Sequence, residues 1–410
     1  MTTSPSSIEL PQIDIDATIE RLAELVVVHA ANVQRGQTVA IGSELGKEQL
    51  TRAVAAAAYR AGAGYVDVSY ADPHVTRARI ANADPDTLED FPDWYRARML
   101  AIGEARCATI AFSGATEPHL LDDLDPALVG REQHAPRVEG MQVINARSTN
   151  WTVAPCPTPG WAALVHPELD PDAALQLLWR EVAYVCRLDT DDPVAAWNER
   201  MRQLGLAAGL LNERRFDSIR LQGPGTDLTV GLLPASTWIY AEGTTAWGNR
   251  HMPNLPSEEV FTTPDPTRTN GVVRATKPLF TSGAVIEDLE VEFRDGRVIR
   301  IDASKNADVL RAQVAKDEGA ARLGELALVD GDGRIGATGT VFYDTLLDEN
   351  AASHIALGAG YGIAAGEDAE RANQSSIHID FMIGSSDVRV TGMDAAGAEH
   401  DVLVQGAWAL

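Results

Sequence analysis

The chain has 410 residues, enough for two or three domains of ordinary size. Hydrophobic residues make up 45% of it, so a real core can form. The net charge of −25 argues against a nucleic-acid or anionic-membrane partner, because phosphate-binding surfaces need an excess of Lys and Arg. The three cysteines are widely spaced and form no paired motif, which favours a reducing compartment. The sequence begins with no signal-peptide pattern and contains no run of about 20 apolar residues. We therefore expect a cytoplasmic protein with no membrane partner.

The first half of the sequence alternates helical and strand-like segments. Helices are predicted where apolar residues recur at a spacing of three or four, and strands where short apolar runs follow glycine turns. In chain order these are a helix over 17–32, a strand over 38–41, a helix over 47–61, a strand over 65–68, a helix over 94–103 and a strand over 108–112. This β-α-β-α rhythm indicates a doubly wound parallel sheet.

Strand-like runs dominate after about residue 217. They cover 219–221, 227–233 and a hairpin of 285–293 with 297–301, and a short helix follows near 307–316. We therefore predict two domains of different class. The first is an N-terminal α/β domain over 1–215, in which the helical stretch 172–214 serves as connector, and the second is a mostly antiparallel α+β domain over 216–410.

One strand-like segment near the C-terminus carries a histidine and an acid at a spacing of two. His378 and Asp380 therefore project from the same face of the strand, where both can reach one metal ion. The same pattern also fits a polar face of an edge strand, so a metal site requires further ligands.

Three acids and a second histidine lie in surroundings that favour burial. Glu349 and His354 are five residues apart and small residues surround them, which fits a ligand pair or, equally, a helix cap and a buried histidine. Glu325 interrupts an apolar run, where an unpaired carboxylate costs several kcal/mol and needs a cation or strong donors. Glu258 and Glu259 are adjacent in a loop bounded by prolines, whose rigidity would position a ligand well.

Charge balance favours joining these residues into one site. Two divalent cations would neutralise four carboxylates, which would not tolerate proximity without them. With two neutral histidines the shell is a mixed set of oxygen and nitrogen ligands, suited to Zn²⁺, Co²⁺ or Mn²⁺. The four acids are Glu259, Glu325, Glu349 and Asp380.

Together these segments resemble the M29 family of metallopeptidases, the aminopeptidase T and aminopeptidase S type, over nearly the whole chain. The resemblance is carried by the segments EEVFTTP, LGE, DEN, SHIALG and HxD. Matched motif by motif, it implies six metal ligands: Glu259, Glu325, Glu349, His354, His378 and Asp380. It also implies that Glu325 bridges two ions and that Tyr361, seven residues after the histidine of SHIALG, belongs to the site.

The resemblance further implies an activity. The expected protein is an aminopeptidase with two divalent ions, Zn, Co or Mn, that activate water and release N-terminal residues from short peptides. Tyr361 would donate a hydrogen bond to the oxyanion, or would pack in the glycine-rich turn around it. The general base stays open between Glu258 and a ligand carboxylate, and a homodimer is the expected assembly.

Two other functions compete with this interpretation. Relatives on the same scaffold open dihydroxypyridine rings with a single non-haem iron, held by two histidines and an aspartate. Those enzymes have no need of Glu259, Glu325 and Glu349, so the presence of all three favours two metals. The second competitor, a non-catalytic protein that binds a small ligand, leaves the four acids unexplained.

Overall fold

The structure, a computed structural model, describes residues 8–132, 137–281 and 284–410, and it divides into two compact units. The parallel-sheet unit comprises residues 9–197 and 242–256. The antiparallel unit comprises residues 198–241 and 257–410, together with the start of the chain. The change of unit at Trp197 falls inside the stretch 172–214, where the sequence predicts a connector. Two separately folding domains remain a proposal.

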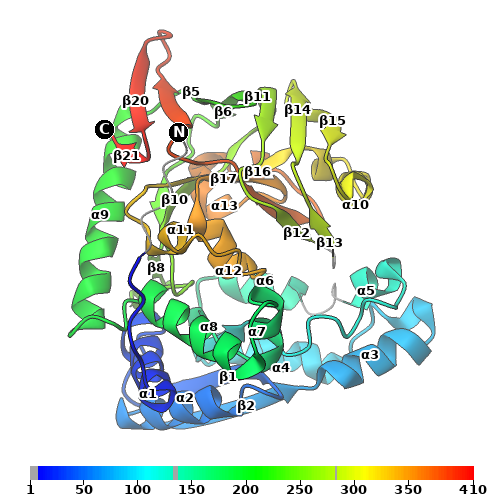
Figure 1. The fold of residues 1–410 in the computed structure, drawn as a ribbon, viewed down its shortest axis with the longest axis vertical. Helices are drawn as coiled ribbons and strands as arrows, with labels where there is room; N and C mark the ends of the chain where they lie inside the picture. The colour runs from blue at the N-terminus through cyan, green and yellow to red at the C-terminus, as the bar shows by residue number, and fades with distance from the viewer. Residues whose placement is uncertain (1–7, 133–136, 282–283) are drawn as a thin grey trace. The chain divides into compact units, whose positions relative to one another are not determined.

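The parallel-sheet unit is built around four parallel strands in the order β2-β1-β3-β4 (Figure 1). The chain runs from β1 to β2 on one side and then crosses to β3 and β4 on the other, which is the doubly wound arrangement that the sequence predicts. Its strands are β1 (Thr38–Glu44), β2 (Tyr65–Ala71), β3 (Ala108–Ser113), β4 (Asn150–Pro155), and the short pair β8 (Gly243–Thr244) and β9 (Arg250–His251).

Side chains cap the start of several helices of this unit. Asp14 accepts a hydrogen bond from the Ala17 backbone N–H, so the first helix starts at Ile15, two residues before its predicted start. The helices are α1 (Ile15–Leu25), η1 (Val26–Ala30), α2 (Glu48–Arg60), α3 (Pro73–Asn82), η2 (Pro85–Thr87), α4 (Asp93–Glu104), α5 (Pro126–Glu132), α6 (Arg137–Asn145), α7 (Pro159–Val165) and α8 (Pro171–Val185).

The antiparallel unit holds two larger sheets, of eight and five strands. The eight-stranded sheet has the order β15-β14-β11-β6-β5-β19-β20-β21. Its strands are β5 (Ser218–Gly223), β6 (Thr226–Leu232), β11 (Pro264–Arg274), β14 (Glu290–Arg294), β15 (Arg297–Asp302), β19 (Arg389–Met393), β20 (Glu399–Val404) and β21 (Ala407–Trp408). This mostly antiparallel unit is the class that the sequence predicts for the second half.

The predicted strand over 285–293 is wrong as one element. It is two strands, β13 (Ala284–Ile286), which pairs with β12 (Leu279–Thr281), and β14, which pairs with β11 and β15. Between them Asp288 has a φ of 52°, a left-handed backbone conformation that an extended strand cannot contain. Hydrophobic spacing does not reveal such a break.

The five-stranded sheet has the order β18-β17-β16-β10-β7 and carries the candidate site. Its strands are β7 (Ile239–Tyr240), β10 (Glu259–Thr262), β16 (Leu323–Val329), β17 (His354–Gly358) and β18 (His378–Met382). All residues of β16 and β17 are buried, so both strands lie in the core. A charged residue on them is therefore held by a rigid, water-poor scaffold.

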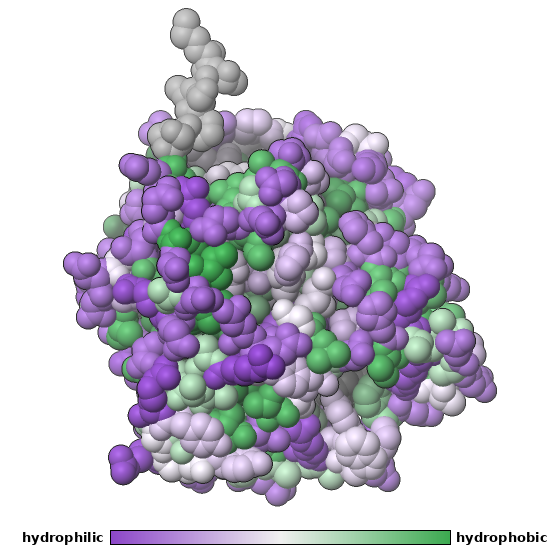
Figure 2. Space-filling view, turned by 60° about the horizontal axis from the view of Figure 1, so that its bottom comes forward, coloured by the Kyte–Doolittle hydropathy of each residue, from purple (hydrophilic) through white to green (hydrophobic). Residues whose placement is uncertain are grey.

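One long helix, α9, precedes the strands of this unit, and short helices connect them. The helices are α9 (Pro193–Arg214), which begins in the parallel-sheet unit, α10 (Ala307–Val314), η3 (Gly319–Ala321), α11 (Arg334–Thr338), α12 (Thr345–Asp348), η4 (Glu349–Ala351), α13 (Gly362–Ala365) and η5 (Gly366–Arg371). Among the described residues no helix has both the length and the apolar character needed to cross a membrane. Hydrophilic residues cover much of the face in Figure 2, with hydrophobic residues scattered between them.

Candidate metal centre

Five of the six predicted ligands lie on one face of the five-stranded sheet. Glu259 on β10 pairs with Val329 on β16. Ala327, two residues before Val329 on the same strand, pairs with His354 on β17. Glu325 pairs with an alanine of β17 that in turn pairs with Asp380. Paired residues, and residues two apart, share a face. His378 joins them because it lies two residues before Asp380.

The positions between these ligands on the same face are small. Ala327 and Ala356 lie beside the acidic and histidine side chains, and Gly358 pairs with His378. Small side chains at these positions let the longer glutamates lean across the sheet and leave space above it. The row Glu325–Ala356–Asp380 is the clearest case, because the alanine separates two acids on alternate strands.

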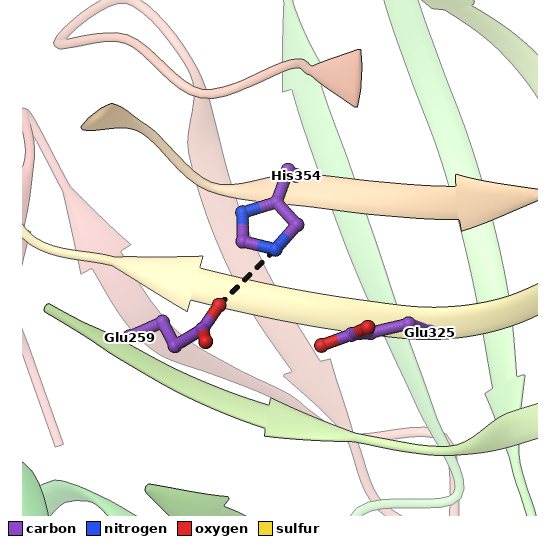
Figure 3. A group of neighbouring side chains, drawn as sticks. All are labelled: Glu259, Glu325 and His354. Carbon is purple, nitrogen blue, oxygen red and sulfur yellow. Dashed lines mark ion pairs between the residues drawn. The ribbon is translucent and has the colours of Figure 1, made fainter. Parts of the chain in front are cut away.

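The first group of converging ligand atoms comes from three adjacent strands. Glu259, Glu325 and His354 each offer one atom, and these atoms lie within 4.8 Å of one another (Figure 3). His354 Nε2 is 3.1 Å from Glu259 Oε2. The three residues are 1–6% exposed, so this group is closed off from solvent.

The second group shares Glu325 with the first. Glu325, His378 and Asp380 also offer ligand atoms within 4.8 Å of one another. His378 Nε2 is 3.1 Å from Glu325 Oε2 and 3.4 Å from Asp380 Oδ1. The His378 side chain is 25% exposed, so the second group is the more open of the two.

Backbone carbonyls set the orientation of both imidazole rings. Nδ1 of His354 lies 3.1 Å from the Ala352 carbonyl oxygen, and Nδ1 of His378 lies 2.8 Å from that of Ala359. A carbonyl oxygen only accepts, so each Nδ1 carries the hydrogen. In the neutral ring Nε2 then presents a lone pair to the carboxylates, the orientation found in metal-ligating histidines.

The donor set fits divalent metal ions. Among the described residues, Glu259 Oε2 and Asp380 Oδ1 are buried oxygens without a hydrogen-bond partner, although a histidine nitrogen lies near each. Lone pairs that face one another at about 3 Å repel unless a cation or a proton lies between them. Oxygen and nitrogen atoms at this separation match two ligands of one ion with bonds of about 2.0–2.2 Å.

Glu349, on η4, lies close enough to the other acids for their negative charges to change its pKa. Burial raises its pKa well above the ordinary value, and the charges of Glu259 and Asp380 raise it further. Burial likewise raises the pKa of Glu325, against the opposing effect of His378. Burial alone would lower the pKa of His354, but the carboxylates, Glu259 first, raise it to about 10. Without cations the site is thus short of positive charge.

These shifts predict how the chelated protein responds to pH. Folded carboxyls with raised pKa values and a histidine with a pKa of about 10 hold protons that the unfolded chain releases near pH 4.5 and 6.5. The folded state therefore binds more protons across this range, and its stability falls as the pH rises from about 4.5 toward 10. Urea unfolding of chelated protein at several pH values measures this fall, which saturating metal should reduce. A metal-free protein that becomes more stable at higher pH would contradict the assignment.

Tyr361 lies at the open side of the centre. Its ring makes edge contacts with two rings, that of His378, with centroids 5.1 Å apart, and that of Phe261, with centroids 5.6 Å apart. It is 37% exposed, while its backbone carbonyl accepts a hydrogen bond from Thr263 Oγ1. Burial raises the pKa of its hydroxyl, so this group stays a hydrogen-bond donor at neutral pH.

Glu258 has a different role from its neighbour. It is fully buried and forms an ion pair with Arg200, whereas Glu259 turns toward His354. The structure thus brings Glu259, and not Glu258, to the candidate ligands. Sequence reasoning missed Arg200 and Asn350, which contact Glu258. The sequence did contain one signal for such partners, namely the two adjacent acids. If both carboxylates are buried, each needs its own positively charged or hydrogen-bonding partner.

Comparison with known proteins agrees with the geometry. The family model for thermophilic metalloprotease (M29) matches residues 15–408. Aminopeptidase T of Thermus aquaticus is 40% identical over 402 residues, which cover 96% of this chain and 98% of that protein.

Two solved structures share the fold. AmpT from Thermus thermophilus superposes with a TM-score of 0.90 at 38% identity, covering 97% of this chain and all of that one. The 2,5-dihydroxypyridine dioxygenase of Pseudomonas putida has a TM-score of 0.50 at 14% identity over 97% of this chain and 98% of its own, a likeness of fold alone. On its match to the family model and its 40% identity to a relative of equal length, this chain belongs to the thermophilic metalloprotease (M29) family.

Proposed function

We propose that this protein is an aminopeptidase that uses two divalent metal ions to release N-terminal residues from short peptides. The observation that carries the proposal is the pair of ligand groups that share Glu325. Family membership supports peptide-bond hydrolysis by a metalloprotease, and the related protein of Thermus aquaticus is named an aminopeptidase.

Each side chain has a role in the proposal. Glu259, Glu349 and His354 would hold one ion, His378 and Asp380 would hold the other, and Glu325, common to both groups, would be shared between them. Bound ions would polarise the scissile carbonyl and lower the pKa of a water molecule. Zn, Co and Mn all suit this mixture of carboxylate and imidazole ligands.

Substrate would approach over the more open side of the centre. His378 is partly exposed there and Tyr361 lies against its ring. The Tyr361 hydroxyl is protonated at neutral pH and can donate a hydrogen bond to the oxygen on which negative charge develops.

Replacing Tyr361 with phenylalanine tests its role. We expect kcat to fall about 10²-fold to 10³-fold, the usual effect of removing one oxyanion donor, with metal content unchanged. Steady-state kinetics with an aminoacyl-anilide and metal analysis of the same sample measure both. If kcat is unchanged in a fully metallated variant, Tyr361 does not donate to the oxyanion and serves only to pack against its neighbours.

The activity itself is tested with matched free and blocked peptides. Chelated protein should cleave neither, and after addition of Zn²⁺, Co²⁺ or Mn²⁺ it should release the first residue of free peptides only. Cleavage of N-acetylated peptides, or activity that chelation leaves intact, would contradict the proposal. A series of increasing peptide length tests the preference for short substrates, and light scattering tests the proposed homodimer.

The ring-opening alternative requires only one metal ion. The second ligand group, the buried Glu259 and the half-buried Glu349 are unexplained by a single iron held by His378, Asp380 and one more histidine. A non-catalytic binding protein leaves the same acids without a function. Metal stoichiometry separates these possibilities from the proposal.

A further inference from the structure

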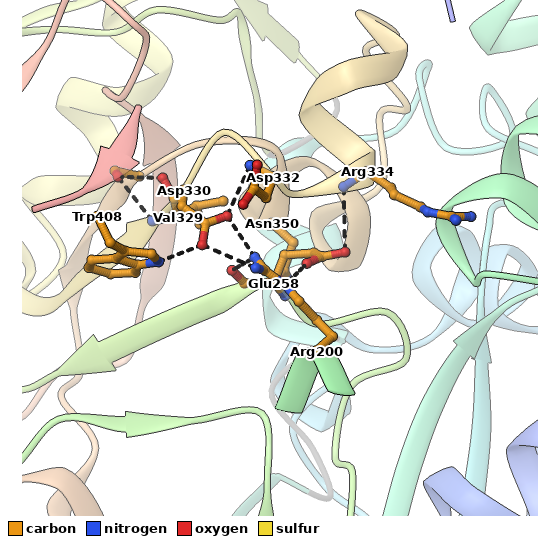
Figure 4. A network of polar contacts seen from close by, with 9 residues as sticks. Arg200, Glu258, Val329, Asp330, Asp332, Arg334, Asn350 and Trp408 are labelled. Carbon is orange, nitrogen blue, oxygen red and sulfur yellow. Dashed lines mark hydrogen bonds and ion pairs between the residues drawn. The ribbon is translucent and has the colours of Figure 1, made fainter. Parts of the chain in front are cut away.

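A buried charge network lies at the end of β10 and β16, next to the metal centre (Figure 4). Its centre is Arg200 of α9, which is only 4% exposed. The guanidinium donates to Glu258 Oε2 at 2.5 Å and, through two nitrogens, to both carboxylate oxygens of Asp330 at 3.0 and 2.8 Å. Burial would lower the pKa of Arg200, but the charges of Glu258 and Asp330 hold it above its ordinary value.

The strand register places this network one step from a metal ligand. Glu259 pairs with Val329 at the end of the antiparallel ladder, and Glu258 and Asp330 are the residues just outside that pair. Glu258 forms an ion pair with Arg200, whereas Glu259 lies beside His354, so the two adjacent acids face different partners. Arg200 therefore links the two segments that adjoin β10 and β16, one residue away from Glu259.

Asn350 connects the same network to a second ligand. Its side-chain oxygen accepts a hydrogen bond from the Glu258 backbone N–H at 2.7 Å, and its amide donates to the Leu346 carbonyl at 3.1 Å. Asn350 is fully buried and directly follows Glu349. A single side chain thus ties the backbone beside Glu259 to the helix η4 that carries Glu349.

The remaining contacts hold the network rigidly in place. Asp330 also accepts from Trp408 Nε1 at 2.5 Å and from the Asp332 backbone N–H at 3.1 Å. Its two oxygens therefore accept from fixed donors as well as from Arg200. The link from Arg200 to Glu258 and Asn350 has little freedom to relax when one member changes.

We propose that Arg200 and Asn350 are positioning residues that set the spacing of Glu259 and Glu349, and so the affinity of one metal ion. This inference rests on the two-metal function proposed above. The ion next to His354 would depend on Glu259 and, as proposed above, on Glu349, whereas the ion next to His378 would depend on Asp380. The hydrogen bond from the Glu258 N–H to Asn350 joins the segments that carry the first two acids, so we expect its loss to weaken mainly the ion next to His354.

The test measures the affinity of each ion separately. Zn²⁺ binding is titrated by calorimetry in two backgrounds, H378A, which keeps the ion next to His354, and H354A, which keeps the other. Asn350→Leu is then added to each. We expect the dissociation constant to rise about 10-fold to 100-fold in the H378A background, the usual effect of losing an outer contact to a metal ligand. In the H354A background we expect it to stay unchanged.

A second variant and a matched control distinguish a specific effect on the metal ligands from a general loss of folding. Arg200→Lys keeps the charge but loses the forked geometry, and it should shift the same dissociation constant in the same direction. Arg220→Lys is the control, because Arg220 donates twice to Asp227 at 2.9 Å in a more exposed pair away from the ligands. We expect this control to change neither affinity.

Two results would overturn the inference. One is an unchanged affinity for the ion next to His354 in both variants, and the other is an equal loss at both ions. The proposed function fails by a different result, namely wild-type protein that binds only one ion. The two failures are therefore distinguishable in the same set of titrations.

Discussion

Replacing Glu325 with glutamine is expected to reduce kcat/KM at least about 10³-fold, equivalent to about 4 kcal/mol of transition-state stabilisation. The reason is geometric, since Glu325 is the residue common to both ligand groups. Glutamine keeps the size of the side chain but removes the negative charge that two cations would share. Both ions should therefore bind more weakly, and metal analysis after dialysis should find less than one ion per chain.

Asp380→Asn is the matched comparison for this variant. Asp380 belongs to only one of the two groups, so we expect its substitution to release one ion and retain the other. Circular dichroism of both variants shows whether the fold persists. If Glu325→Gln keeps its full metal content, or if both variants lose the same amount of metal, the proposal that Glu325 is shared by two ions is contradicted.

Replacing Arg200 with methionine is expected to lower the free energy of unfolding by about 3–5 kcal/mol. The substitution leaves Glu258 and Asp330 as buried carboxylates without their cation, and these side chains are 0% and 3% exposed. Removing one partner of a buried pair is costly because the other charge cannot return to water. Urea unfolding of the metal-free protein measures the loss without a contribution from metal binding.

Arg220→Met provides the surface comparison. Its partner Asp227 is 59% exposed, so we expect a loss of no more than about 1 kcal/mol. If Arg200→Met and Arg220→Met unfold at the same urea concentration, the network around Arg200 contributes no special stability. The inference that it positions the metal ligands would then lose its physical basis.

Much of the fold follows from local sequence patterns. The glycine turns and short apolar runs predicted β1, β2 and β3 of the parallel sheet. Burial explains this signal for β1 and β3, which are largely buried, but not for β2, an edge strand whose residues are exposed or half-buried. The apolar run around Glu325 predicted a buried strand with a charge in need of a partner, and all of β16 is buried. The spacing of His378 and Asp380 predicted a shared face, which the register reproduces.

Convergence of the site could not be predicted from spacing alone. Glu259, Glu325 and His354 lie on adjacent strands only because of the order β17-β16-β10, and no local pattern encodes that order. The choice between Glu258 and Glu259 depended on Arg200, which lies 58 residues earlier in the chain. A long-range ion pair leaves no periodic signal in the sequence.

The account is tested most directly by counting metal ions while activity is restored. Chelated protein is titrated with Zn²⁺, Co²⁺ or Mn²⁺, and release of the N-terminal residue from a free peptide is measured at each step. We predict that activity reaches its maximum when two ions are bound per chain. Full activity with one bound ion, or with none, would contradict a centre bridged by Glu325.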